Sequence, residues 1–215
     1  MKNQIFIIKL VFLLSMLFSS HAFAVNTAFS KNKEISEWDQ RRVNAWHDLM
    51  ARNQGGSTLD KLSRVNTFVN QIQYAEDAQQ WGRKDYWATP AEFITGNAGD
   101  CEDYAITKYF TLINMGVPES QLRIAYVHSL ILKQAHMVLY YYPGSGQQPL
   151  VLDNYDEQIK PAKNRADLLP VYSFNKKGLW LIKKNGSNQY VGSASRLSRW
   201  TEMLKRLPQN TFASL

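Results

Sequence analysis

The spacing of apolar residues changes partway along the chain, and this change limits the folds that the sequence can adopt. Before residue 116, apolar side chains recur at mostly helical intervals, which predicts main helices at residues 34–52, 57–72 and 101–115. After residue 121, they gather in short runs rich in β-branched and aromatic residues, which are typical of strands. The predicted strands cover residues 122–127, 136–142, 150–153 and 179–182, and a closing basic helix covers residues 195–207. Helices followed by an antiparallel meander indicate an α+β domain.

Two local patterns predict where helices begin. Ser57 and Asp60 have the spacing of a capping box, in which the first side chain accepts a hydrogen bond from a backbone N–H three residues later. Thr89 and Glu92 repeat this spacing, with Pro90 at the first helical position.

The first 24 residues have the pattern of a secretory signal peptide. Lys2 gives a basic start, residues 5–18 are mostly apolar, and Ala22-Phe23-Ala24 places small residues at the expected cleavage site. The apolar stretch falls short of the ~20 residues that span a bilayer, so we favour cleavage after Ala24 over a permanent anchor. We therefore predict a single exported domain, residues 25–215, that is not embedded in the membrane.

The formal net charge of +7 would by itself suggest a nucleic-acid partner. Cleavage of the signal peptide removes Lys2 and Lys9 and lowers this charge to +5. An exported protein does not meet intracellular nucleic acid, and the sequence has no basic run interleaved with aromatic residues, as a groove for single strands requires. We therefore expect no nucleic-acid partner.

Cys101 is the only cysteine of the sequence, which excludes an internal disulfide and a zinc site of the CxxC type. In an exported protein a lone cysteine is either buried and inert or a working thiol. Its position at the start of a predicted helix favours the working thiol, because unpaired N–H groups and the helix dipole stabilise a thiolate there.

His136 and Asp153 are candidates for the base and the residue that orients it. They lie on consecutive predicted strands that are joined by a Pro-Gly-Ser-Gly turn. If Tyr142 faces Gln147 in this hairpin, then His136 faces Asp153 on the same side of the sheet, within reach of a hydrogen bond. A nucleophile at a helix start, then a histidine strand, then an aspartate strand is the order found in papain-like and transglutaminase-like enzymes.

Three acidic residues, Asp100, Glu102 and Asp103, surround Cys101. Their negative charge would raise the pKa of the thiol and oppose formation of the thiolate. The residues alone leave three interpretations open: an inactive site, a solvated helix start that favours acids, or a bound calcium ion that neutralises the carboxylates.

Three segments of the chain resemble the bacterial transglutaminase-like cysteine proteinases. They are Gly99-Asp100-Cys101-Glu102-Asp103-Tyr104-Ala105-Ile106, Ala135-His136-Met137-Val138-Leu139 and Val151-Leu152-Asp153-Asn154. The resemblance extends from about Trp38 to Trp180 and is strongest to the periplasmic members that release large biofilm adhesins. It implies a papain-like, transglutaminase-like fold, in which a helical N-terminal part presents the catalytic cysteine to an antiparallel sheet carrying histidine and aspartate.

The resemblance also implies a function. Cys101, His136 and Asp153 would form the triad of a calcium-dependent periplasmic endopeptidase. Asp100, Glu102 and Asp103 would be the calcium ligands. The substrate would be the N-terminal region of a large adhesin, cut between small residues, typically a pair of alanines. The implied partner is an inner-membrane cyclic-di-GMP receptor whose periplasmic domain sequesters the protease.

Two alternatives share these residues. A transglutaminase or amidase of the same fold would use the same acyl-enzyme chemistry on another exported protein or on a cell-wall peptide. A non-catalytic binding module would have kept the fold alone, and the presence of all of Cys101, His136 and Asp153 argues against it.

Overall fold

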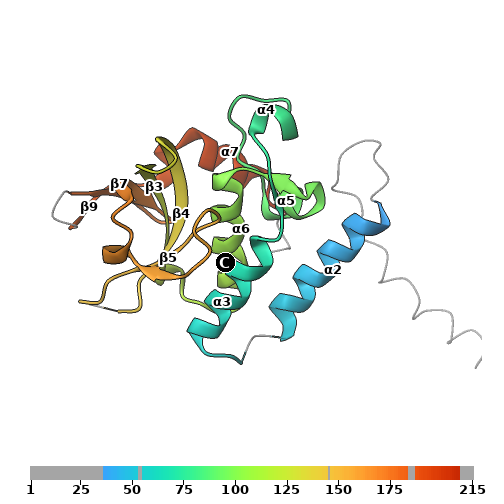
Figure 1. Ribbon diagram of the computed structural model, residues 1–215, viewed down its shortest axis with the longest axis horizontal. Coiled ribbons are helices and arrows are strands. Elements are labelled where there is room, and N and C mark those ends of the chain that lie inside the picture. The colour runs from blue at the N-terminus through green and yellow to red at the C-terminus, as the bar shows by residue number, and fades with distance from the viewer. Residues whose placement is uncertain (1–35, 53–54, 145, 184–186, 209–215) are drawn as a thin grey trace, which may run out of the picture. The chain divides into compact units, whose positions relative to one another are not determined.

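A central helix packed against one face of an antiparallel sheet forms the core of the protein (Figure 1). The computed structural model describes residues 36–52, 55–144, 146–183 and 187–208. The predicted signal peptide, residues 1–24, lies outside the described residues. None of the helices within the described ranges is long and apolar enough to cross a membrane.

The helices confirm the main helical predictions. They are α2 (Glu37–Arg52), α3 (Thr58–Val69), α4 (Asp77–Gln80), α5 (Pro90–Gly96), α6 (Cys101–Asn114) and α7 (Ser198–Arg206). Ser57 caps α3 by accepting from the backbone N–H of Asp60, and Thr89 and Glu92 form a complete capping box at α5. The closing helix is shorter than predicted, because Ala194–Arg196 forms a separate 3₁₀ turn before it.

The seven-stranded sheet has the order β6-β5-β4-β3-β7-β8-β9, and every neighbouring pair is antiparallel. The strands are β3 (Leu122–Ser129), β4 (Gln134–Tyr141), β5 (Leu150–Leu152), β6 (Lys160–Pro161), β7 (Leu168–Phe174), β8 (Leu179–Ile182) and β9 (Asn188–Gly192). The predicted meander is correct for β3, β4 and β5, and β6, which was not predicted, continues it. The chain then crosses back and adds β7 on the free side of β3, so the sheet grows in both directions from its first strand. A separate two-stranded parallel pair joins β1 (Gln73–Tyr74) to β2 (Ala98–Gly99).

The strand β7 was not predicted, because Pro170 interrupts its apolar pattern. Proline lacks the N–H that a ladder needs, so it is confined to edges and bulges. In the structure Tyr126 pairs with Tyr172 and Val127 pairs with Pro170, which leaves Val171 as the extra residue of a bulge. The bulge therefore explains how a central strand accommodates a proline.

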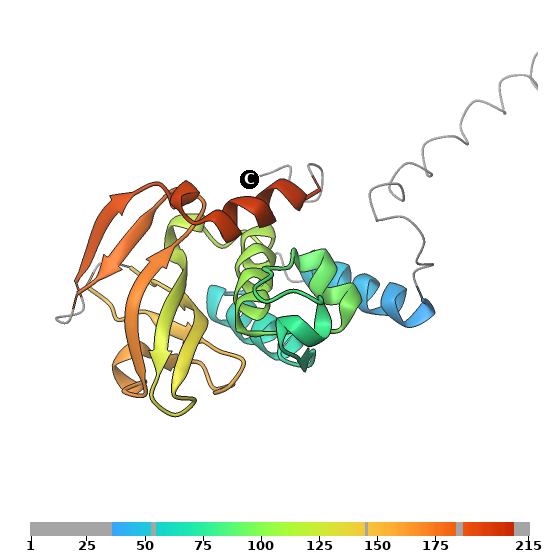
Figure 2. The same cartoon turned by 90° about the horizontal axis from the view of Figure 1, so that it is seen from above.

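Both faces of the sheet are buried in its centre. One face, with Ile124, Leu139 and Phe174 among its residues, packs on α6, while the other carries a smaller cluster that includes Val127 and Val138. Figure 2 shows α7 lying across the junction of the sheet and the helices. Trp200 of α7 packs at this junction, where its ring contacts Phe110 of α6 and Phe174 of β7 at centroid distances of 5.8 and 5.2 Å. The helix α6 is thereby held on several sides, and its first residue has a defined position against β4.

Candidate active site

A short parallel bridge brings two distant acidic segments together at the start of α6. β1 pairs with β2, and the N–H of Ala75 extends this pairing by donating to the carbonyl of Gly99 at 2.9 Å. Asp77, the first residue of α4, consequently lies beside Asp100, the residue that precedes α6. The bridge assembles a site from residues that are more than twenty positions apart.

Cys101 is the first residue of α6 and is partly exposed. Its Sγ atom lies 3.1 Å from Oε2 of Glu102, and the backbone of Met137 in β4 also hydrogen-bonds to it. Burial raises the pKa of the thiol well above its ordinary value, and the charges of Glu102 and Asp100 raise it further. Burial and the neighbouring acids therefore both oppose ionisation of the thiol, and the effect of the acids is the one that the sequence predicted.

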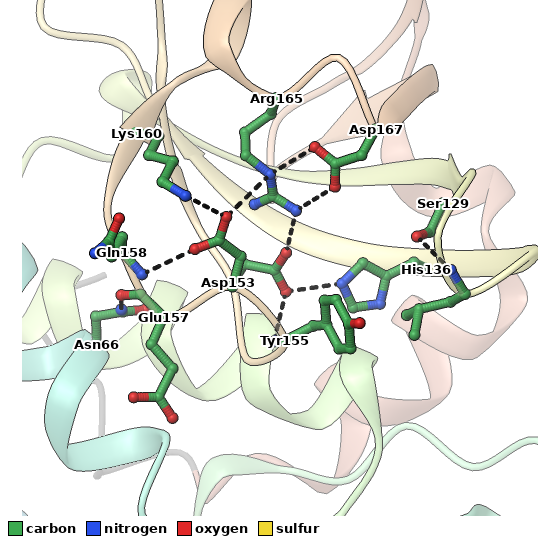
Figure 3. A network of polar contacts seen from close by, with 12 residues as sticks. Asn66, Ser129, His136, Asp153, Tyr155, Glu157, Gln158, Lys160, Arg165 and Asp167 are labelled. Atoms are coloured by element: carbon green, nitrogen blue, oxygen red, sulfur yellow. Dashed lines mark hydrogen bonds and ion pairs between the residues drawn. The ribbon is translucent and has the colours of Figure 1, made fainter.

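His136 and Asp153 meet in a buried hydrogen bond, although the predicted hairpin register is wrong by two residues. Tyr141 pairs with Leu150 and Leu139 with Leu152, which places Asp153 just beyond the end of β5 rather than directly opposite His136. A shift of two residues keeps both side chains on the same face of the sheet. Nε2 of His136 lies 2.8 Å from Oδ1 of Asp153, and the two residues are 3% and 1% exposed (Figure 3).

Asp153 is held ionised by its surroundings. Burial alone would raise its pKa, but the hydrogen bond and charge of His136, the N–H of Tyr155 and the guanidinium of Arg165 together hold the pKa well below its ordinary value. The Tyr155 N–H donates to Oδ1 at 3.0 Å, and Arg165 donates to Oδ2 at 2.8 Å. Because Nε2 of His136 is bonded to this carboxylate, Nδ1 is the ring nitrogen left to exchange a proton with another group.

Cys101 and His136 line the same cavity, which has a volume of about 380 Å³. Its walls are aromatic and apolar at Trp87, Tyr126 and Met137. Cavities of this size with a few convergent polar groups are typical of ligand sites. A thiol at a helix start, an imidazole in the same cavity and a carboxylate behind that imidazole are the elements of nucleophilic acyl transfer.

The carboxylates that the structure brings together are Asp77, Asp100 and Glu102, whose ligand atoms all lie within 4.8 Å of one another. Within the described part of the chain, Oδ1 of Asp77 and Oδ1 of Asp100 are buried and have no hydrogen-bond partner. Burial and the neighbouring carboxylates raise the pKa of Asp77 to about 6 and that of Asp100 to about 10. Buried oxygen atoms that lack a donor and repel one another fit a hard cation such as calcium.

Asp77 was not among the residues predicted from the sequence. It lies outside every predicted helix and strand, and only the β1–β2 bridge brings it to the cysteine loop. The alternative of a solvated helix start fails for Asp100, because its side chain is buried and, within the described residues, accepts no cap hydrogen bond from α6.

Asp103 has protein donors of its own. Its carboxylate accepts from the N–H of Ala88 at 2.7 Å and from the indole N–H of Trp81 at 3.3 Å. The fit is close, since a Cβ on Gly99 would lie 2.3 Å from Oδ2 of Asp103 and 2.8 Å from the ring of Phe93. Asp103 therefore ties the loop before α5 to α6, and its role as a calcium ligand stays a prediction.

The sequence as a whole places these residues in a family. Residues 31–182 match the profile of a family described as bacterial transglutaminase-like cysteine proteinase BTLCP, and the chain belongs to this family. The protein is accordingly a cysteine peptidase. A comparison with curated proteins found no match.

Solved structures of LapG from Legionella pneumophila resemble this chain closely. One is 44% identical, covers 79% of this chain and 90% of its own, and has a TM-score of 0.71. A calcium-bound LapG from the same organism is 43% identical over 80% of this chain and 93% of its own, with a TM-score of 0.72. An EGTA-treated LapG is 44% identical over 79% of this chain and 90% of its own, also with a TM-score of 0.72. These matches confirm the predicted transglutaminase-like fold of helices on an antiparallel sheet.

Proposed function

We propose that this protein is a calcium-dependent periplasmic cysteine endopeptidase that cleaves the N-terminal region of a large biofilm adhesin and so releases it from the cell surface. The observation that carries the proposal is the buried His136–Asp153 pair, of which His136 lines the same cavity as Cys101. Membership of the cysteine proteinase family and the likeness to LapG support it.

The proposed reaction uses three side chains and one backbone group. Nδ1 of His136 takes the proton of the Cys101 thiol, and the sulfur attacks the scissile carbonyl carbon. The backbone N–H of Cys101, at the start of α6, donates to the oxyanion that forms. His136 then protonates the leaving amine, and water hydrolyses the acyl-enzyme. Asp153 keeps the proton of the neutral ring on Nε2 and stabilises the imidazolium form.

Asp77, Asp100 and Glu102 would hold the calcium ion, with other oxygen ligands completing its shell. A bound cation would supply positive charge that neutralises these carboxylates, including Glu102, whose carboxylate is hydrogen-bonded to the thiol. The unpartnered oxygens of Asp77 and Asp100 support this proposal, as does the existence of calcium-bound and EGTA-treated structures of LapG. Without this charge, the carboxylates oppose the thiolate that the reaction needs.

The periplasmic location and the partners rest on the sequence. The signal-peptide pattern of residues 1–24 supports export. The adhesin substrate, cut between small residues, is what the resemblance of the sequence motifs implies. An inner-membrane cyclic-di-GMP receptor with an inhibitory periplasmic domain is the proposed regulatory partner.

Incubation with the purified N-terminal region of a candidate adhesin tests the proposal. We expect one cut in calcium, none in EGTA, and none with Cys101→Ala in either buffer. A folded Cys101→Ala protein that still cut the adhesin would overturn the proposed nucleophile, and undiminished cutting in EGTA would overturn the calcium requirement. A primary amine added to the reaction distinguishes a transglutaminase, which would transfer the acyl group to the amine instead of to water.

A further inference from the structure

A buried arginine lies behind the His136–Asp153 pair (Figure 3). Arg165 follows the 3₁₀ turn Ala162–Asn164 and is only 3% exposed. Its Nη2 atom donates to Oδ2 of Asp153 at 2.8 Å, while Nε2 of His136 meets the other oxygen, Oδ1, at the same distance. Each oxygen of this carboxylate therefore has its own side-chain partner.

The guanidinium of Arg165 is itself fixed on a second side. Its Nε donates to Oδ1 of Asp167 at 3.0 Å, and its Nη2 lies 2.8 Å from Oδ2 of the same carboxylate. Asp156 lies 3.7 Å from Nε and is engaged by Lys160 at 2.6 Å. A planar fork held by two hydrogen bonds on one carboxylate has little freedom to rotate.

We propose that Arg165 is a positioning residue, which acts through Asp153 to fix the orientation and tautomer of the His136 ring. The inference deepens the proposed function and rests on it. A carboxylate bonded at one oxygen can still turn about its Cβ–Cγ bond, whereas one bonded at both oxygens by fixed donors cannot. The Tyr155 N–H supports the same oxygen as His136, so Arg165 is the only side chain, within the described residues, that hydrogen-bonds to Oδ2.

The surrounding charges are consistent with a positioning role. Asp153 lies within electrostatic reach of Lys108 of α6, whose pKa burial lowers to about 7. In the network of Figure 3, Arg165 is a cation anchored by a hydrogen bond to Asp153. Lys108 makes no hydrogen bond to Asp153 among the described residues and acts on it through its charge alone. Only the anchored cation can determine the plane of the carboxylate.

A graded series of variants tests the proposal. Arg165→Gln removes the charge and the fork, Arg165→Lys keeps the charge without the planar fork, and Asp167→Asn weakens the anchor of the guanidinium. Arg123→Gln is the matched control, because Arg123 is a partly buried arginine of β3 that stacks on Trp180 at 3.9 Å and has no contact with Asp153 among the described interactions.

The measurements are kcat and KM on the adhesin fragment in calcium, and the ¹⁵N chemical shifts of the His136 ring in each folded variant. We expect Arg165→Gln to lower kcat by about 10- to 100-fold with KM unchanged, as for other partners that orient a functional side chain. The losses with Arg165→Lys and Asp167→Asn should be smaller. The ring shifts should report a single Nε2-protonated tautomer in the native protein and in Arg123→Gln, and a mixture in Arg165→Gln.

A purely structural role for Arg165 would give a different result. Arg165→Gln and Arg123→Gln would then both lower the melting temperature while kcat and the His136 shifts stayed native, and the proposal would be overturned. An Arg165→Gln protein that cannot be purified folded leaves Arg165→Lys and Asp167→Asn to decide: native kcat and native shifts in both also overturn it. Activity in Cys101→Ala would instead refute the proposed function, and the ring shifts would still report on Arg165 without any substrate.

Discussion

The candidate active site contains buried carboxylates in two different environments. Asp153 lies beside cationic partners, whereas Asp77 and Asp100 lie beside each other and beside Glu102. The oxygens of Asp153 accept hydrogen bonds from His136 and Arg165, and the pKa of Asp153 lies well below its ordinary value. Asp77 and Asp100 face another carboxylate instead, each with one oxygen that lacks a donor among the described residues, and their pKa values are raised.

The difference indicates which of these carboxylates needs a bound cation to balance its charge. The chain supplies every cation that Asp153 needs, so the orientation of His136 is built into the fold. The Asp77–Asp100–Glu102 cluster has a surplus of negative charge that a bound cation can remove. Under the proposed function, the first group provides a permanent catalytic geometry and the second makes the thiol responsive to calcium.

The largest expected effect comes from replacing Asp153, whose charge the protein itself balances. Asp153→Asn keeps the size of the side chain but removes the charge that keeps the neutral His136 ring protonated on Nε2, so kcat should fall by roughly 10³- to 10⁴-fold. The same change leaves Arg165 buried beside a neutral amide, which should also lower the free energy of unfolding. Steady-state kinetics and thermal unfolding measure the two effects. Near-native kcat in a folded Asp153→Asn protein would contradict the assigned role.

Neutralising Asp77 or Asp100 should have the opposite effect on stability. In EGTA, Asp77→Asn and Asp100→Asn should raise the melting temperature, because an amide is neither ionised beside the other carboxylates nor required to take up a proton on folding, as a carboxyl with a raised pKa is. In calcium, the native protein should gain up to ~2.7 kcal/mol at a hundredfold excess over Kd, and the variants should lose most of that gain. Asp48→Asn, in an exposed ion pair with Arg52, serves as the control and should change neither quantity. A calcium response that survives in both cluster variants would refute these ligands.

A smaller effect is expected from pH in the absence of calcium. The folded pKa values of Asp77, about 6, and Asp100, about 10, exceed the ordinary value of 3.8, so the folded protein binds more protons than the unfolded chain above about pH 4. This contribution to stability is fully present below pH 4 and is lost as the pH rises through 6 and towards 10. Asp153 has the opposite sign, and its contribution is lost as the pH falls below about 4. Denaturant melts in EGTA should show stability falling from pH 5 to pH 8, and calcium should flatten this slope; an equal slope in both buffers would count against the cluster.

Features that depend on neighbouring residues were predictable from the sequence. The caps at Ser57 and Thr89 involve residues three positions apart, so the helix starts followed from spacing alone. The His136–Asp153 contact was predicted even though the register was wrong, because a two-residue shift preserves the face on which a side chain lies.

Features that depend on long-range pairing were not predictable. Asp77 reaches the cysteine loop through a parallel bridge of two residues, too short to leave a periodic signal. The strand β7 was not predicted because it contains Pro170. Only the bulge in the folded sheet shows why the proline is tolerated there. Arg165 lies in an irregular segment, and no sequence pattern associates it with Asp153.

The single cysteine permits a direct test of whether calcium activates the thiol, because any thiol label on the folded protein reports on Cys101 alone. The measurement is the rate of alkylation by iodoacetamide at neutral pH, followed by mass spectrometry, in calcium and in EGTA. We expect a faster rate in calcium, and little or no increase in His136→Ala or Asp100→Asn. Equal rates for the native protein in the two buffers would contradict the claim that a cation at this cluster, together with His136, activates Cys101.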